Sequence, residues 1–296
     1  MKILPVAEPP VRGYLYYAYH LIVLSNYRGY DNWLHSNYIQ IECDPNYQVH
    51  LYTTIWHVVR DEFTSRSALR SLGMEIVPFV IDSLEQDYYV MTYVDEFYIP
   101  GKRCYQREHN FHEILIYGYL PDRAAFLTVG YNHEQKFIAG EVSYSDFQAA
   151  FNAPEANTTI KLFKKRQDVD FDLNTEDIRE LLLDLLYSRN TYKRFKRMGY
   201  SREGCVYGLE VYDRLAEYLG LLATGEEEYD HRQMYLLWEH KKCMVNRLKF
   251  LHDRGCMKSG STIPAYEEIE RKALVLRNML LKTRVTGDTS VMPMEA

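Results

Sequence analysis

The most informative part of this sequence is QREHNFHEILIYGYLPDRAAFLTVGYNHEQKF, which runs from Gln106 to Phe137. A largely apolar run from Glu113 to Gly118 is followed by the turn cluster Leu120 to Arg123 and by a second apolar run, Ala124 to Val129. Two apolar runs of strand length that flank a Pro-Asp turn predict a β-hairpin or two adjacent strands. His112 directly precedes the first run, so we expect its side chain at the mouth of that strand.

Length and charge limit the kind of protein to which this hairpin belongs. The chain has 296 residues, enough for one large domain or two modest ones, and we expect two lobes. Its formal net charge of −6 provides no broad basic field for a phosphate backbone, so nucleic acid is not expected as a partner. The basic run Lys161 to Arg166 is a local exception, which we interpret as a solvated charged segment.

The sequence shows no motif for crossing a membrane or for binding a metal or a nucleotide. No apolar run has the roughly 20 residues that a membrane helix needs, and Pro5 and Glu8 interrupt the N-terminal stretch where a signal peptide requires an apolar core. We therefore expect a cytoplasmic protein without membrane contact. The five cysteines are widely spaced and form no C-x-x-C pair, so no disulfide framework or metal site is predicted. Because P-loop, G-x-G-x-x-G and G-x-S-x-G motifs are missing, no nucleotide-binding or α/β-hydrolase chemistry is indicated.

The first half combines strands with a few helices. Tyr14 to Leu24 is an aromatic and aliphatic run that we interpret as a strand, and Tyr88 to Asp95 is the clearest strand of the sequence. Ile76 to Leu84 predicts a helix. The segment Val142 to Phe151 predicts a short strand that turns into a helix capped by Ser143 or Ser145.

The segment from Tyr30 to Cys43 allows two interpretations. Apolar residues at three- and four-residue spacings predict a helix that begins at Asp31 or Asn32. Alternation from Tyr38 to Cys43 instead predicts a strand. The pattern leaves both open.

Beyond Asn174 the pattern is helical almost throughout. Asn174 is a suitable N-cap, and Glu176 and Asp177 place carboxylates in the first turn, where they meet the positive end of the helix dipole. Three further helices are predicted over 206–222, 230–251 and 264–282. We therefore predict an α+β fold with a first lobe over residues 1–165, a helical lobe over 170–285 and a disordered tail over 286–296.

Several segments resemble the papain-like proteins of the butirosin-biosynthesis-H type, a family of acyltransferase relatives from gene clusters for peptide and aminoglycoside natural products. The resemblance covers most of the chain and implies a papain-like, cysteine-peptidase-type lobe followed by an all-helical lobe. The matching segments are YYVMTYVD (88–95), FYIP (97–100), HEILIYGY (112–119), VSYSDFQAAF (142–151), YGLEVYDRLAEYL (207–219) and WEHKKCMVNRLKFL (238–251).

In that family a cysteine at the start of the first helix takes an acyl group from the phosphopantetheine arm of a carrier protein, assisted by a histidine and by an acidic or amide residue. The resemblance implies His112 as the general base and Asn132, after the second strand of the hairpin, as the residue that orients it. The position of the nucleophile holds no cysteine. We rank Cys43 ahead of Ser36 and Ser25, since a thiol is the more reactive group.

Two functions remain open at this point. The first is acyl or peptidyl transfer from a carrier-protein thioester in the biosynthesis of a nonribosomal peptide or related product, with no cofactor of the protein's own. The alternative is a catalytically silent papain-like scaffold that binds a carrier protein or a synthetase.

Trp238, Lys241 and Lys242 lie on a predicted helix. Their spacing is typical of an ordinary amphipathic surface helix, but a dock for the acyl or peptidyl carrier protein, or a lid over a cleft, is the functional alternative. A dock requires exposed basic side chains at Lys241, Lys242, Arg247 and Lys249. The sequence leaves the oligomeric state open.

Overall fold

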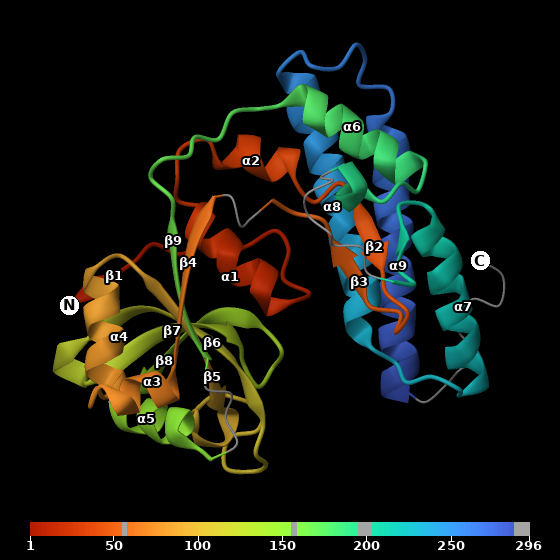
Figure 1. Cartoon of the computed structure of the whole chain (residues 1–296). Helices are drawn as coiled ribbons and strands as arrows, with labels where there is room; N and C mark the ends of the chain where they lie inside the picture. The colour runs from red at the N-terminus through yellow and green to blue at the C-terminus, as the bar shows by residue number, and fades with distance from the viewer. Residues whose placement is uncertain (55–57, 155–158, 195–202, 287–296) are drawn as a thin grey trace. The chain divides into compact units, whose positions relative to one another are not determined.

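The computed structural model describes residues 1–54, 58–154, 159–194 and 203–286, and it shows a mixed α+β fold (Figure 1). The chain divides into two compact units. Unit 1 comprises residues 1–9, 15–27 and 55–169, and unit 2 comprises residues 10–14, 28–54 and 170–296. The first lobe predicted from the sequence, residues 1–165, thus includes two segments that belong to unit 2. All but the first residue of the predicted tail, 286–296, lies outside the described residues.

Unit 1 is built on a seven-stranded sheet in which the strands pair antiparallel. The strand order is β4-β9-β5-β6-β7-β8, and β1 pairs with β6. The bounds of the strands are Lys2–Ile3 for β1, Val59–Ser65 for β4, Tyr89–Asp95 for β5, Phe111–Leu120 for β6, Ala125–Tyr131 for β7, Phe137–Ser143 for β8 and Thr159–Lys165 for β9.

The predicted hairpin is confirmed as β6 and β7, joined by a short 3-10 turn at Pro121–Arg123. Leu115 lies opposite Val129, and the register shifts between Ile116 and Gly118. A Cβ atom at Gly118 would lie 2.9 Å from the carbonyl oxygen of Lys2. The close approach of β1 to the hairpin therefore requires glycine at this position.

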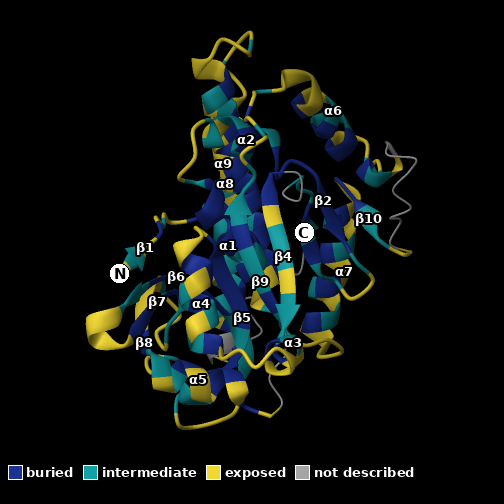
Figure 2. Cartoon of the chain, turned by 60° about the vertical axis from the view of Figure 1, so that its left-hand side comes forward, coloured by how far each residue is buried: buried dark blue, intermediate teal, exposed yellow. Residues whose placement is uncertain are grey.

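Helices cover both faces of this sheet. The short α3 (Arg66–Ser71) follows β4, and α1 (Leu15–Leu24) packs on β9, where the His20 ring lies 4.4 Å from the ring of Phe163. On β5 pack α4 (Ile76–Glu85) and α5 (Tyr144–Asn152), of which the second is capped by Ser143. Every residue of β5 except Tyr93 is buried, as expected for a strand covered on both faces, whereas β4 at the sheet edge is largely accessible (Figure 2).

The strand predicted for residues 14–24 is wrong, because this segment forms α1. All residues of α1 except Tyr16 are buried. A helix buried on all sides shows no polar stripe, and it therefore lacks the 3.6-residue alternation by which a helix is recognised in a sequence. The run contains leucine and alanine, which favour helices, but its four tyrosines and its β-branched residues are typical of a strand.

Unit 2 joins a small three-stranded sheet to helices. Both interpretations of residues 30–43 are realised in succession, as a helix and then a strand. The helix starts at Tyr30 after Gly29, whose φ is 80°, and it has no side-chain cap from Asp31 or Asn32. The bounds are Tyr30–Ser36 for α2, Ile41–Cys43 for β2, Val49–Leu51 for β3 and Val206–Tyr207 for β10, and the strand order is β10-β2-β3.

The four helices predicted beyond Asn174 are confirmed. Asn174 accepts hydrogen bonds from the backbone N–H groups of Glu176 and Asp177, as the cap assignment requires. None of the described helices combines the length and the apolar character needed to cross a bilayer. The bounds are Thr175–Leu186 for α6, Glu210–Thr224 for α7, His231–Asp253 for α8 and Ile263–Thr286 for α9.

Two glycines allow a matched test of backbone geometry in unit 2. Gly208 has φ of 59°, and a Cβ atom there would lie 2.3 Å from the carbonyl oxygen of Leu185; Gly225 has φ of 76° with open space around it. We expect Gly225→Ala to cost about 1 kcal/mol of unfolding free energy, since only the left-handed backbone is penalised. Gly208→Ala should cost about 3 kcal/mol or more, because the backbone must also move. Urea unfolding measures both, and equal costs would contradict the clash.

Candidate functional site

His112 lies near the start of β6 within a group of polar side chains. Its Nδ1 atom is 3.4 Å from Oε2 of Glu113, and the imidazole is 43% exposed. The hydroxyl of Tyr93, on the neighbouring strand β5, donates to Oε1 of Glu113 over 3.1 Å. Burial and the Glu113 carboxylate raise the pKa of Tyr93 to about 12, so the phenol keeps its proton at neutral pH. Glu113 thus contacts both the imidazole of His112 and the phenol of Tyr93.

Asn132 follows the last residue of β7, so it lies at the same end of the hairpin as His112. Continuing the register of Leu115 with Val129 by three residues in each strand would set Asn132 opposite His112. The side-chain oxygen of Asn132 accepts hydrogen bonds from the backbone N–H groups of Glu134 and Lys136, at 3.0 and 2.9 Å. Its acceptor therefore closes the turn between β7 and β8.

Two further residues at this end of the sheet were missed by sequence reasoning. The hydroxyl of Tyr19, on α1, donates to the carbonyl oxygen of Glu113, and Nζ of Lys102 donates to that of Tyr131. A Cβ atom at Gly130 would be 3.4 Å from both polar atoms. These contacts join segments up to 94 residues apart, and no local pattern indicates them.

A second histidine forms a closer carboxylate pair than His112. Nδ1 of His109 lies 2.6 Å from Oδ2 of Asp95, which is fully buried, while the imidazole is 60% exposed and stacks on Phe97. The other carboxylate oxygen of Asp95 accepts the backbone N–H groups of Phe97 and Asn110. Asp95 thus anchors the loop between β5 and β6, and it also orients the ring of His109.

Cys104 in the same loop does not complete a catalytic group with His109. Its Sγ atom lies 3.4 Å from Oε1 of Glu108, and burial together with this carboxylate raises the pKa of the thiol. A raised pKa leaves the thiol protonated and weakly nucleophilic.

Each candidate nucleophile has a structural role. Cys43 is fully buried in β2, and burial together with Asp44 raises its pKa to about 12. It belongs to unit 2, whereas His112 and Asn132 belong to unit 1. The hydroxyl of Ser36 donates to the carbonyl oxygen of Asn32, and that of Ser25 to the carbonyl oxygen of Ile22, as is common on helices.

Lys241 does not lie on an exposed surface. Its side chain is buried, with Nζ 3.1 Å from Nδ1 of His240 and above the ring of Tyr212. Burial lowers its pKa to about 7. Arg247 is buried as well, so the exposure that a carrier dock requires is wrong for both residues. The interpretation of this stretch as an ordinary surface helix is also wrong, since Glu239, His240 and Lys241 are all buried.

The other two dock candidates differ in exposure. Nε1 of Trp238 donates to Oε1 of Glu270 over 2.5 Å, which ties the half-buried indole to α9. Lys242 is exposed, with its ammonium 5.3 Å from the centre of the Trp238 ring. Among Trp238, Lys241 and Lys242, only Lys242 has an exposed charge. Lys249, the remaining basic residue of the predicted dock, is exposed as well, and its Nζ lies 2.6 Å from Oε1 of Glu267.

The buried polar side chains of α8 form hydrogen bonds with backbone groups of segments far away in the sequence. Oε1 and Oε2 of Glu239 accept the N–H groups of Arg12 and Gly13, at 2.8 and 2.9 Å. Nε2 of His240 is 2.7 Å from the carbonyl oxygen of Ile39 and must donate to it, so Nδ1 accepts from Lys241. The guanidinium of Arg247 donates to backbone carbonyl oxygens at the C-terminal end of α2, those of His35 and Asn37. These are structural roles.

No group of three or more potential metal ligands occurs among residues 1–54, 58–154, 159–194 and 203–286. A scan of the sequence against protein-family models finds no match, and a search of curated proteins finds none either. The chemistry of the site has to be argued from its own residues.

The cysteines provide a direct test of nucleophile accessibility. Cys43 is buried with a raised pKa, whereas Cys256 is exposed. We expect iodoacetamide at pH 8 to modify Cys256 in the folded protein and to modify Cys43 only after unfolding, since the thiolate is the reactive form. Peptide mapping by mass spectrometry measures both rates. Comparable rates would show that Cys43 is accessible and acidic.

Glu239 should give unit 2 a characteristic pH dependence. Burial raises the pKa of Glu239 to about 7 from 4.5, against the opposing effect of the two N–H donors. Between these values the folded state binds more protons than the unfolded state, so this residue's contribution to stability falls as the pH rises from about 4.5 to 7. Over this pH range, the contribution of Glu239 to the free energy of unfolding falls by on the order of 3 kcal/mol.

Glu239→Gln removes the titration and serves as the reference. It also loses one of the two hydrogen bonds, which adds an offset that does not depend on pH. Unfolding free energies of both proteins at pH 5, 6, 7 and 8 give the difference. A difference that stays constant between pH 5 and 7 would contradict the raised pKa.

Proposed function

We propose that this chain is a catalytically silent papain-like protein that binds an acyl or peptidyl carrier protein in the biosynthesis of a nonribosomal peptide or related product. The partner class follows from the resemblance of the sequence to the butirosin-biosynthesis-H type. The absence of catalysis rests on one observation: none of the candidate nucleophiles Cys43, Ser36 and Ser25 is activated in the structure.

The energetics of the thiol support this proposal. A papain-like cysteine works as a thiolate, which a helix N-terminus and a neighbouring imidazolium stabilise. Cys43 lies in a strand instead, and its pKa of about 12 leaves roughly one molecule in 10⁵ ionised at pH 7. The first residues of α1 and α2 contain neither cysteine nor serine: they are Leu15 and Tyr16 in α1, and Tyr30 and Asp31 in α2.

The arrangement in unit 1 is compatible with a papain-like origin. His112 near the start of a strand and Asn132 at the end of the next one are the parts that the resemblance implies. The side-chain oxygen of Asn132 is used in its turn. His112 and Asn132 are therefore both present at this end of the hairpin, but Asn132 does not orient the imidazole through this oxygen. A fold that loses its chemistry can keep a binding surface.

Acyl or peptidyl transfer is the second candidate. What favours it is the half-exposed His112 next to Glu113, a pair suited to take a proton from an acceptor amine. Transfer without a covalent intermediate would need only this base and an oxyanion site. The two candidates differ in whether an acyl group leaves the carrier.

Incubation with a carrier protein loaded with an acyl thioester separates them. We expect no acyl adduct on the chain by intact mass and no loss of acyl group from the carrier, because no thiolate or activated hydroxyl is available. Binding of the carrier, measured by isothermal titration calorimetry, should be the same for the native chain, Cys43→Ala and Ser36→Ala.

Turnover that disappears in His112→Ala would instead establish the transferase. His252→Ala serves as a matched control in that assay, since His252 is a similarly exposed histidine beside a carboxylate, that of Asp253 at 3.6 Å. If no loaded or unloaded carrier binds, both candidates are wrong.

A further inference from the structure

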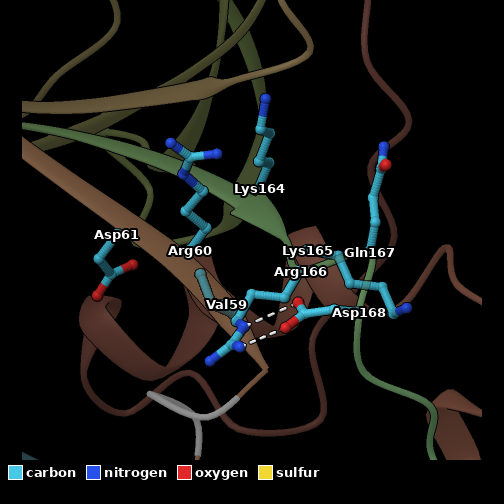
Figure 3. Close-up of a pocket in the computed structure, with 8 residues that line it drawn as sticks. All are labelled: Val59, Arg60, Asp61, Lys164, Lys165, Arg166, Gln167 and Asp168. Atoms are coloured by element: carbon cyan, nitrogen blue, oxygen red, sulfur yellow. Dashed lines mark hydrogen bonds and ion pairs between the residues drawn. The ribbon is translucent and has the colours of Figure 1, made fainter.

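A basic pocket lies at the edge of the sheet in unit 1, where β4 begins and β9 ends. Its volume is about 580 Å³, within the range of small-molecule sites. All of its lining residues belong to unit 1. They are Val59, Arg60, Asp61, Lys164, Lys165, Arg166, Gln167 and Asp168 (Figure 3).

The pairing of the two strands concentrates positive charge there. Arg60 lies directly opposite Lys164 in the antiparallel register, and Arg166 follows at the end of β9, with its N–H bonded to the carbonyl oxygen of Val58. In Figure 3 the side chains of Arg60 and Lys164 project to the same side of the strand pair. Like charges directly opposite each other destabilise a sheet. Glu62 beside Arg60 and the Tyr88 ring, 3.9 Å from Nζ of Lys164, offset this repulsion in part. The cations are nevertheless gathered at one place in a chain of net charge −6.

The two acidic residues of the lining lie apart from the Arg60–Lys164 pair. Asp61 follows Arg60 in β4 and therefore points to the opposite face of the strand, where its Oδ1 lies 3.7 Å from Nε2 of His20. Asp168 is held by the guanidinium of Arg166 through two hydrogen bonds of 3.1 and 2.5 Å. Four basic and two acidic residues line the pocket, which leaves an excess of positive charge there.

An anionic ligand can replace the carboxylates that now pair with Arg60 and Arg166. Arg60 pairs with Glu62 at 2.5 Å, and its side chain is 59% exposed. Arg166 and Asp168 are likewise accessible. Exposed ion pairs of this kind contribute about 0 to 1 kcal/mol, so an anion that binds several of the cations at once competes successfully.

We propose that this pocket binds a small phosphate-bearing polyanion, a diphosphate or a diphosphate ester. Guanidinium groups bind phosphate oxygens through two parallel hydrogen bonds, and lysine adds a point charge. The cations stand at two places, the Arg60–Lys164 pair and Arg166 at the strand end, so two linked phosphates match them better than one. The volume leaves room for an organic group beyond the phosphates. This site is separate from the proposed carrier binding and does not depend on it.

The test uses the full chain with inorganic pyrophosphate and ADP as probes, by isothermal titration calorimetry at 50 mM salt. Lys164→Glu with Arg166→Glu reverses two pocket charges. The matched control is Arg123→Glu with Lys136→Glu, two exposed basic residues of unit 1 that also pair with carboxylates, at 3.0 and 2.6 Å. Both double variants change the net charge equally, so a general charge effect appears in both.

We expect the pocket variant to weaken pyrophosphate and ADP binding at least tenfold and the control to weaken it less than twofold. Orthophosphate should bind the native chain at least tenfold more weakly than pyrophosphate. Lys164→Gln with Arg166→Gln repeats the test if charge reversal disturbs folding. The proposal is overturned by undetectable binding to the native chain, by equal losses in both variants, or by equal affinity for orthophosphate. Carrier binding is measured separately, so its failure would leave this result standing.

Discussion

Unit 2 depends on hydrogen bonds between buried polar side chains of α8 and the backbone of segments more than 180 residues earlier. The Glu239 carboxylate binds two successive N–H groups, and Arg247 binds carbonyl oxygens at the end of α2, where a cation is also favoured by the helix dipole. Gln233 accepts the N–H of Val49 at the start of β3. A buried backbone group without a partner costs roughly 1 to 3 kcal/mol. These side chains therefore determine where the segments 10–14 and 28–54 can lie within unit 2.

This constraint changes how the charged residues of α8 should be understood. Charge on a helix usually marks the solvated face, yet Glu239, His240 and Lys241 are buried because each has a specific partner. Lys241 donates to the imidazole of His240, and its burial lowers its pKa to about 7. Lys241 and Arg247 are thus part of the interior, whereas Lys242 and Lys249 of the predicted dock are exposed.

The sequence predicted those parts of the fold whose pattern is local. The hairpin β6–β7, strand β5 and the helices α6 to α9 follow from alternation, turn residues and caps. The prediction of a strand failed for α1, because burial on all sides removes the helical periodicity. For α8 the helix was predicted, but the burial of its polar residues was not, because their partners are far away in the chain. At the site, the position of His112 at a strand entrance was predictable, whereas the Asp95–His109 pair depends on the path of a long loop.

Most polar side chains considered for catalysis already form hydrogen bonds that stabilise the fold. Asn132 closes a turn, Ser25 and Ser36 satisfy helix carbonyls, and Asp95 anchors a loop, so their presence needs no catalytic explanation. The opposed cations Arg60 and Lys164 also have partners, the Glu62 carboxylate and the Tyr88 ring, but they lie at an accessible sheet edge beside a pocket. Exposed contacts of this kind contribute little to stability, so a ligand can replace them at small cost. The partners of Asp95 and Asn132 are backbone N–H groups that hold a loop and a turn, and replacing them would disturb the fold. On this reasoning the edge of β4 and β9 is better suited to bind a ligand than the polar groups that hold the loops of unit 1.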